Sequence, residues 1–178
     1  MSAWLTIVAF LASGTGQPAL KVPAPRPAMA APLPLAANFT LGVVPATVSF
    51  TATDPDSPLV AGSATTTVSW TVTGNGGRTW NLGLSSAATT FTNCTTVPIS
   101  AVTVTCTSAS AGGGTSTATC GAASTLSNTR TPVASGTEGT FSRSYSVTLT
   151  YTLTDQWKYI ARTSPPCTLS ITYNALVN

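Results

Sequence analysis

Residues 144–154 constrain the fold of this chain most strongly, because their apolar side chains recur at every second position. The apolar members of this run are Tyr145, Val147, Leu149, Tyr151 and Leu153. Serine and threonine fill the positions between them. A period of two is typical of a β-strand with one buried face, whereas a helix would need a period near 3.6. Residues 167–173 repeat the pattern, and no stretch has a convincing helical period.

Shorter segments with strand character precede this run and are separated by turns. They are residues 39–44, 46–52, 65–73, 78–84, 88–94, 100–106 and 115–120. The glycine-rich turn at 74–77 predicts that 65–73 and 78–84 form a hairpin, with Trp70 in the core. About eight or nine strands, each with one apolar face, require two packed sheets. We therefore predict an all-β chain whose residues 37–178 form an immunoglobulin-like, two-sheet antiparallel sandwich.

The charge composition argues against catalysis and against nucleic-acid binding. Only 6% of the residues are charged and histidine is absent, so the commonest general base and metal ligand is missing. The four carboxylates are Asp54, Asp56, Glu138 and Asp155. The Asp54/Asp56 pair fits a proline-rich turn better than a calcium site. We expect no enzymatic activity, no metal and no cofactor. With no basic cluster, nucleic acid is not an expected partner.

Four cysteines predict two disulfides and an oxidising compartment. Cys106 and Cys120 lie symmetrically about a glycine-rich segment, Gly112–Gly114, that resembles a hairpin tip. If the two arms pair, these cysteines face each other and Cys94 is left for Cys167. The alternative joins Cys94 to Cys106, and the sequence leaves both pairings open.

The N-terminal region predicts export. Residues 3–12 are an apolar run of signal-peptide length, too short for a membrane-spanning helix of about 20 residues, although no Lys or Arg precedes them. Cleavage is expected near Gly14 or Gly16, or at Ala28–Ala30. We therefore assign 1–16 as a signal peptide and 17–36 as a Pro/Ala-rich linker or arm. No membrane span is expected in the mature chain, which would be secreted or displayed at the cell surface.

An alternating apolar segment joins the linker to the predicted sandwich. The candidate assembly strand comprises Leu33, Leu35, Phe39, Leu41, Gly42 and Val43. With this extended N-terminal arm, the chain resembles subunits of chaperone–usher pili and spore-coat-U-like secreted proteins. The resemblance implies that the arm completes the sandwich of a neighbouring copy by β-strand addition. The alternative is that residues 38–44 form the first strand of their own domain. Pro32 and Pro34 cannot donate ladder hydrogen bonds, and the cysteine arrangement differs from that of pilus subunits.

Two functional hypotheses follow from these patterns. The first is an extracellular structural subunit that assembles with copies of itself into a filament, such as a pilus, or a coat. The second is a monomeric secreted adhesin or carbohydrate-binding module of unknown ligand, for which Trp80 and Trp157 are candidate contacts. Asn38 and Asn93 begin candidate N-glycosylation sequons.

Overall fold

The computed structural model describes residues 3–11, 40–52, 59–72, 76–160 and 164–178, the first of these ranges as backbone only. The strands are β1 (Ala3–Leu11), β2 (Gly42–Val44), β3 (Thr47–Ala52), β4 (Leu59–Ala61), β5 (Thr66–Val72), β6 (Thr79–Ser85), β7 (Thr90–Phe91), β8 (Cys94–Pro98), β9 (Val102–Ala111), β10 (Thr117–Cys120), β11 (Ser124–Thr125), β12 (Thr131–Thr137), β13 (Arg143–Thr154) and β14 (Cys167–Val177). One 3-10 turn, η1 (Ile99–Ala101), precedes β9. The described chain is therefore all-β, as the alternating pattern predicts.

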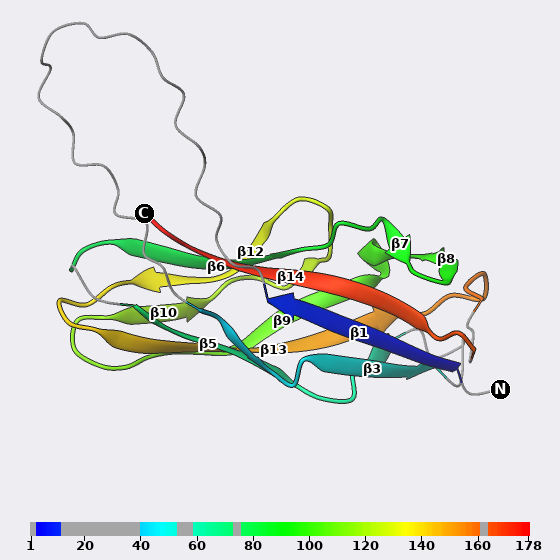
Figure 1. Ribbon diagram of the computed structural model, residues 1–178, viewed down its shortest axis with the longest axis horizontal. Helices are drawn as coiled ribbons and strands as arrows, with labels where there is room; N and C mark the ends of the chain where they lie inside the picture. Colours follow the sequence, from blue (N-terminus) through cyan, green and yellow to red (C-terminus); the bar gives the residue numbers. More distant parts are fainter. Residues whose placement is uncertain (1–2, 12–39, 53–58, 73–75, 161–163) are drawn as a thin grey trace, which may run out of the picture.

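Two sheets of six strands each form a sandwich, and the strands run along its long axis (Figure 1). The first sheet has the order β10-β12-β6-β14-β1-β3. The second has the order β11-β9-β13-β5-β2, and β4 pairs with the far end of β13. The β7–β8 pair forms a small separate sheet. The pairings are antiparallel except that of β1 with β14, which is parallel. The two-sheet prediction is thus confirmed, with one parallel pair added to it.

The long strand β13 supplies the centre of the core. Its five apolar residues are all buried, and the hydroxyl residues between them are partly exposed. Trp70 packs against Trp80 and Tyr145, with ring centroids 5.1 and 5.7 Å away, respectively. The core position predicted for Trp70 is confirmed. Trp80 is only 1% exposed, so it also belongs to the core and cannot be a surface contact.

Neither predicted hairpin is a hairpin in the structure. β5 lies in the second sheet and β6 in the first, although the turn at 74–77 connects them in sequence. Similarly, β9 pairs with β11 and β13, whereas β10 pairs with β12 in the opposite layer. The apolar pattern does not distinguish the two arrangements, because a strand buries its apolar face in the shared core whichever sheet it joins. Turn residues reverse the chain direction without fixing which sheet the next strand joins.

No helix in the described ranges is long and apolar enough to cross a membrane.

Candidate strand-acceptor site

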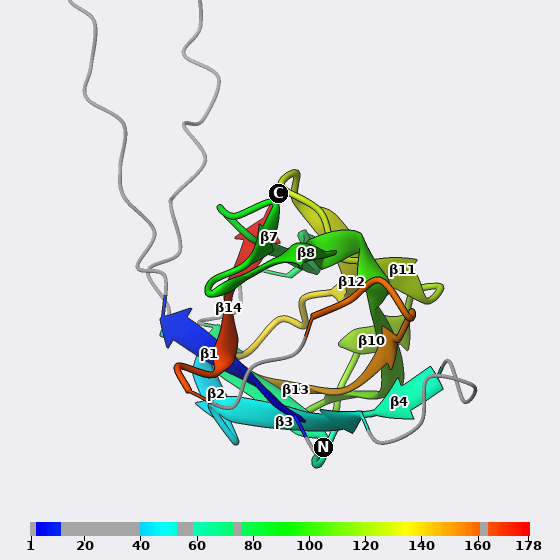
Figure 2. The ribbon, with the colours of Figure 1, turned by 90° about the vertical axis from the view of Figure 1, so that its right-hand side faces the viewer.

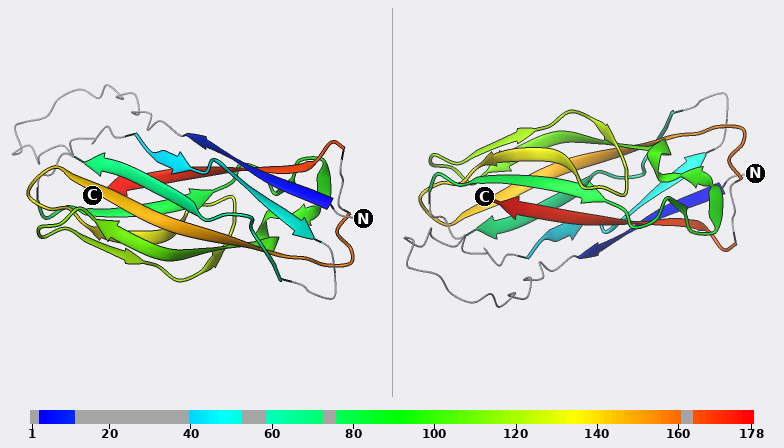
Figure 3. Two further views of the ribbon diagram at one scale, coloured as in Figure 1. Left: turned by 90° about the horizontal axis from the view of Figure 1, so that it is seen from below. Right: turned by 90° about the horizontal axis from the view of Figure 1, so that it is seen from above.

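The most unusual element of the first sheet is β1, the apolar segment predicted to be a signal peptide. It lies between β14 and β3, parallel to the first and antiparallel to the second (Figure 2). Figure 3 shows the same arrangement from two further sides. We call this place in the sheet, between β14 and β3, the β1 position. Residues 12–39, which connect β1 to the remainder of the chain, lie outside the described residues.

The register places alternate residues of β1 opposite buried residues on both sides. Leu5 lies opposite Cys167 of β14 and Phe50 of β3. Ile7 lies opposite Leu169 and Val48. All four of these neighbours are buried. The register therefore sets positions 5 and 7 of the β1 backbone level with buried residues of β14 and β3.

The backbone on either side of β1 depends on this strand for its ladder. Among the described residues, β3 has no other strand partner in the first sheet. β14 pairs with β6 over Thr172–Val177, whereas β1 covers its edge from Cys167 to Tyr173. Without a strand at the β1 position, both edges would present unpaired N–H and C=O groups. The facing edges of β3 and β14 therefore depend on a strand at the β1 position for these hydrogen bonds.

A buried polar pair joins the two sheets at Tyr173, the residue of β14 that lies opposite Leu11 of β1. The Tyr151 and Tyr173 hydroxyls, from opposite sheets, lie 2.5 Å apart. Burial raises the pKa of both phenols above the ordinary value, that of Tyr173 to about 12. Both side chains are consequently neutral over the physiological range, and the hydrogen bond joins the layers without placing charge in the core.

The predicted assembly strand divides between described and undescribed residues. Leu33, Leu35 and Phe39 lie outside the described part of the chain. Leu41 is buried, and Gly42 and Val43 belong to β2, which pairs with β5 of the same chain. Residues 42–44 are thus a strand of the second sheet of their own domain, as in the alternative that assigns residues 38–44 to that domain.

Two disulfides are present, as predicted, and they reinforce different parts of the sandwich. The pairs are Cys94–Cys167 and Cys106–Cys120. The second pair joins β9 to β10 and therefore links the two sheets instead of closing a hairpin ladder. The first pair joins β8 to the beginning of β14, beside the Thr92–Thr168 bridge. These bonds are compatible with an extracellular protein.

The candidate glycosylation sites have different outcomes. Asn38 lies outside the described residues. Asn93 is exposed, and its side-chain amide donates a hydrogen bond of 3.1 Å to the Pro166 carbonyl oxygen. Its neighbour in the sequon, Cys94, is the buried disulfide residue. A glycan on Asn93 would be attached to the same nitrogen, which keeps one N–H after glycosylation.

The carboxylates are dispersed. Glu138 is buried and accepts hydrogen bonds from Arg78, whose Nε and Nη2 both lie 2.7 Å from Oε2. Asp155 accepts a hydrogen bond from the Gln156 backbone in a surface loop. Asp54 and Asp56 lie outside the described residues. No group of three or more metal-ligand side chains occurs in the described ranges.

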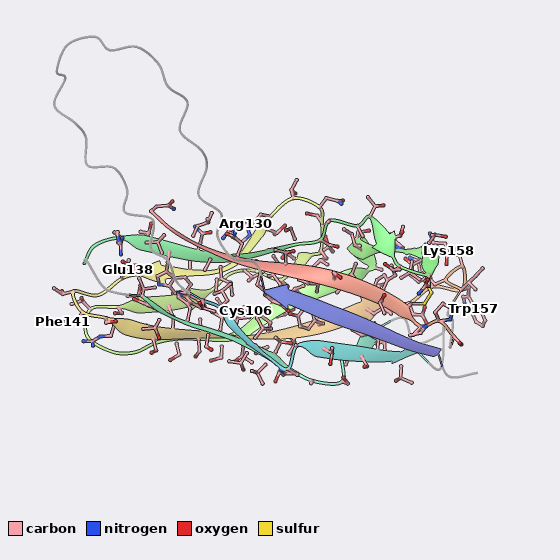
Figure 4. The ribbon with its side chains drawn as sticks, viewed as in Figure 1. Cys106, Arg130, Glu138, Phe141, Trp157 and Lys158 are labelled. Carbon is pink, nitrogen blue, oxygen red and sulfur yellow. A yellow bond between two sulfur atoms is a disulfide. The ribbon has the colours of Figure 1, made fainter. Side chains whose placement is uncertain are left out.

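One end of the molecule presents an exposed tryptophan, and the other end an exposed phenylalanine (Figure 4). Trp157 is 75% exposed at the apex of a turn closed by the Tyr159 N–H and the Gln156 carbonyl, which are 2.8 Å apart. The Ile160 N–H donates to Thr96 Oγ1 of β8 and fixes the loop to the domain. Phe141, at the opposite end, is 68% exposed with the Arg143 guanidinium over its ring.

Comparison with known proteins adds no assignment to this geometry: no family model, curated protein or solved structure matches the chain.

Proposed function

We propose that this protein is an extracellular structural subunit, with an immunoglobulin-like sandwich, that self-assembles into a filament or coat by β-strand addition. One observation carries the proposal. The first sheet includes a strand, β1, that is separated in sequence from all the other strands by residues 12–39. A strand held in this way can be replaced by an equivalent strand from a neighbour, because the ladder contacts are made by backbone groups.

The acceptor in this proposal is the β1 position. Its two edges, on β3 and β14, pair with β1 in the structure and would offer their backbone groups to another strand once β1 has left. The row of buried neighbours, which includes Phe50, Val48 and Leu169, favours apolar residues at every second position of that strand. Burial of such residues between subunits would make assembly hard to reverse.

The donor in this proposal is the alternating segment that precedes β2. Leu33, Leu35 and Phe39 recur at even spacings, as positions 5 and 7 of β1 do. Because Leu41 is buried in its own domain and β2 begins at Gly42, the part that a neighbour receives ends before Leu41. β2 then anchors the donated segment to the subunit that supplies it. The disulfides and the charge-poor, hydroxyl-rich surface support an extracellular location.

The direct test compares Leu35→Lys with Ala36→Lys, the neighbouring residue on the other face of the alternating segment. Negative-stain electron microscopy and light scattering of protein recovered from the medium should show filaments or sheets for the native chain and for Ala36→Lys. Leu35→Lys should be exported normally and remain dispersed, since its charge would enter the neighbour's core. Native protein that has lost residues 3–11 and is still monodisperse at all concentrations would contradict the proposal, as would normal assembly of Leu35→Lys.

A second candidate function, a secreted adhesin or carbohydrate-binding module, is favoured by the exposed Trp157. The side chain is held at one end of the molecule by a loop that is hydrogen-bonded to β8, which is suited to stacking against a ligand. A glycan array should then show binding that Trp157→Ala abolishes without lowering the melting temperature. Phe141→Ala, at the opposite end, is the matched control and should bind normally.

A further inference from the structure

The segment with the composition of a signal peptide is also a strand of the folded domain. Residues 3–11 are apolar enough to be an export signal, yet they pair on both sides within the first sheet. The pairing runs from Leu5 to Leu11 along β14 and from Ala3 to Val8 along β3. The same residues therefore combine the composition of an export signal with a place in the sheet.

Only one strand can lie between β3 and β14. While β1 lies there, its backbone occupies the hydrogen-bonding groups of both edges that a strand from another copy would need. We propose that Ala3–Leu11 is an intramolecular plug, a strand that fills the acceptor of its own chain; this proposal rests on the strand-addition function. A second copy donates its strand only after residues 3–11 have left the sheet. The plug couples processing of the N-terminus to assembly.

The sequence places every candidate cleavage site where this coupling needs it. Gly14, Gly16 and Ala28–Ala30 all lie after β1 and before β2. A cut at any of them separates the plug from the domain and leaves β2 to β14 intact. It also leaves the donor segment that begins at Leu33 attached to the subunit. One cleavage would thus free an acceptor and an N-terminal donor in the same molecule.

The tether gives the plug its advantage before cleavage. A strand that is covalently joined to its acceptor through a linker able to span the distance has an effective concentration in the millimolar range. At micromolar protein, the tethered strand would therefore outcompete a strand from another copy by roughly a hundredfold or more. Cutting the tether removes this advantage, so assembly should accelerate by about the same factor, roughly a hundredfold.

The experiment uses the full chain with a recognition site for a specific protease inserted between Gly16 and Gln17. Assembly is followed by light scattering and electron microscopy before and after cutting. We expect the uncut protein to remain monomeric and the cut protein to assemble. A peptide of residues 3–11 with two lysines appended, added in excess, should slow assembly of the cut protein. The same peptide with Ile7→Lys should not, because position 7 lies opposite Leu169 and Val48.

A disulfide staple provides the matched variant. Thr6 of β1 lies directly opposite Ser49 of β3. Ser49 stands between Val48 and Phe50 in the strand, and both of these neighbours are buried. Opposed residues of an antiparallel pair have Cα atoms about 4.5–5.5 Å apart, within the range of a disulfide. Thr6→Cys combined with Ser49→Cys should stay monomeric after cutting. Each single substitution should assemble after cutting as the parent does.

The outcomes distinguish a failure of the plug proposal from a failure of the strand-addition proposal. Equal assembly rates before and after cutting would overturn the plug and leave strand addition standing. Assembly of the stapled, cut protein would do the same. Failure of a fluorescent 3–11 peptide to enter the cut protein would also overturn the plug. If the peptide enters and leaves the β1 position but no assembly occurs under any condition, strand addition itself is wrong.

Discussion

The two sheets are completed in different ways. The second sheet takes all its strands from residues 42–154, and its central strand β13 is flanked by β9 and β5 of the same continuous region. The sixth strand of the first sheet is β1, which precedes residues 12–39 in the sequence. Both sheets bury one face against the other and share a single core. One sheet is therefore complete within residues 42–154, whereas the other includes a strand that is separated from its neighbours in sequence by residues 12–39.

The largest expected effect on stability comes from removing one disulfide at a time. Cys94→Ser with Cys167→Ser opens a loop of 73 residues that fixes β14, and Cys106→Ser with Cys120→Ser opens one of 14 residues between the sheets. Chain entropy predicts losses of about 4.4 and about 3 kcal/mol in the free energy of unfolding. Urea denaturation measures both. A smaller loss for the first pair would show that β14 is already loosely held.

Core truncations compare the central strands directly. Leu149 of β13 and Ile171 of β14 are both fully buried. Leu149→Ala should cost about 2–5 kcal/mol, and Ile171→Ala should fall at the lower end of that range, because β1 beside it can shift and reduce the cavity. Thr148→Ala, on the outer face of β13, is the control and should have little effect. Equal costs for the two buried positions would indicate that β1 is held as firmly as β13.

Alkaline pH should weaken the contact between the sheets at Tyr151 and Tyr173. Burial raises the pKa of each phenol above the unfolded value near 10, that of Tyr173 to about 12. The folded state therefore retains protons that the unfolded chain loses, and stability falls as pH rises above about 10. The fall approaches about 1.4 kcal/mol per pH unit for each group.

Thermal unfolding between pH 9 and 12 measures this decline. The double variant with Tyr151→Phe and Tyr173→Phe should start less stable and lose the component that these phenols contribute. An unchanged slope in the double variant would assign the alkaline sensitivity to other groups.

The smallest expected effect is a local difference in hydrogen exchange between the two sheets. Backbone amides of β3 that pair with β1 should exchange hydrogen faster than those of β13, because β1 is their only strand partner among the described residues of the first sheet. Mass spectrometry of exchanged peptides measures the two rates. The Thr6/Ser49 staple should slow exchange in β3 and leave β13 unaffected. Equal protection of β3 and β13 in the native chain would remove the contrast between the sheets.

Much of the strand pattern could be predicted from the sequence, because burial in a sandwich imposes a period of two. The outer boundaries of β13 and β14 lie within a few residues of those expected, and the alternating burial along β13 is as predicted. The positions of Trp70 and of the two disulfides also depend on local pattern and on cysteine number.

The layer that each strand joins could not be predicted in the same way. The glycine-rich turns after β5 and β9 have ordinary hairpin composition, yet the next strand enters the opposite sheet in both cases. Which sheet a strand joins depends on how the apolar faces of the two sheets pack together, and local turn chemistry does not encode this packing. The pairing of residues 3–11 was missed for a related reason. An unbroken apolar run is typical of a signal peptide and of a strand, and only the presence of β3 and β14 as neighbours distinguishes them.

The direction of β1 has a consequence for the shape of any assembly. Because β1 runs parallel to β14, its Leu11 end lies beside Tyr173, and its other end lies toward Cys167 and the base of the Trp157 loop. Subunits that exchange strands in one fixed direction repeat head to tail, with the vacant acceptor at one terminus and the unused donor at the other. Such a polymer is polar: it grows differently at its two ends, and only one terminus of each filament would display a free acceptor to the surroundings.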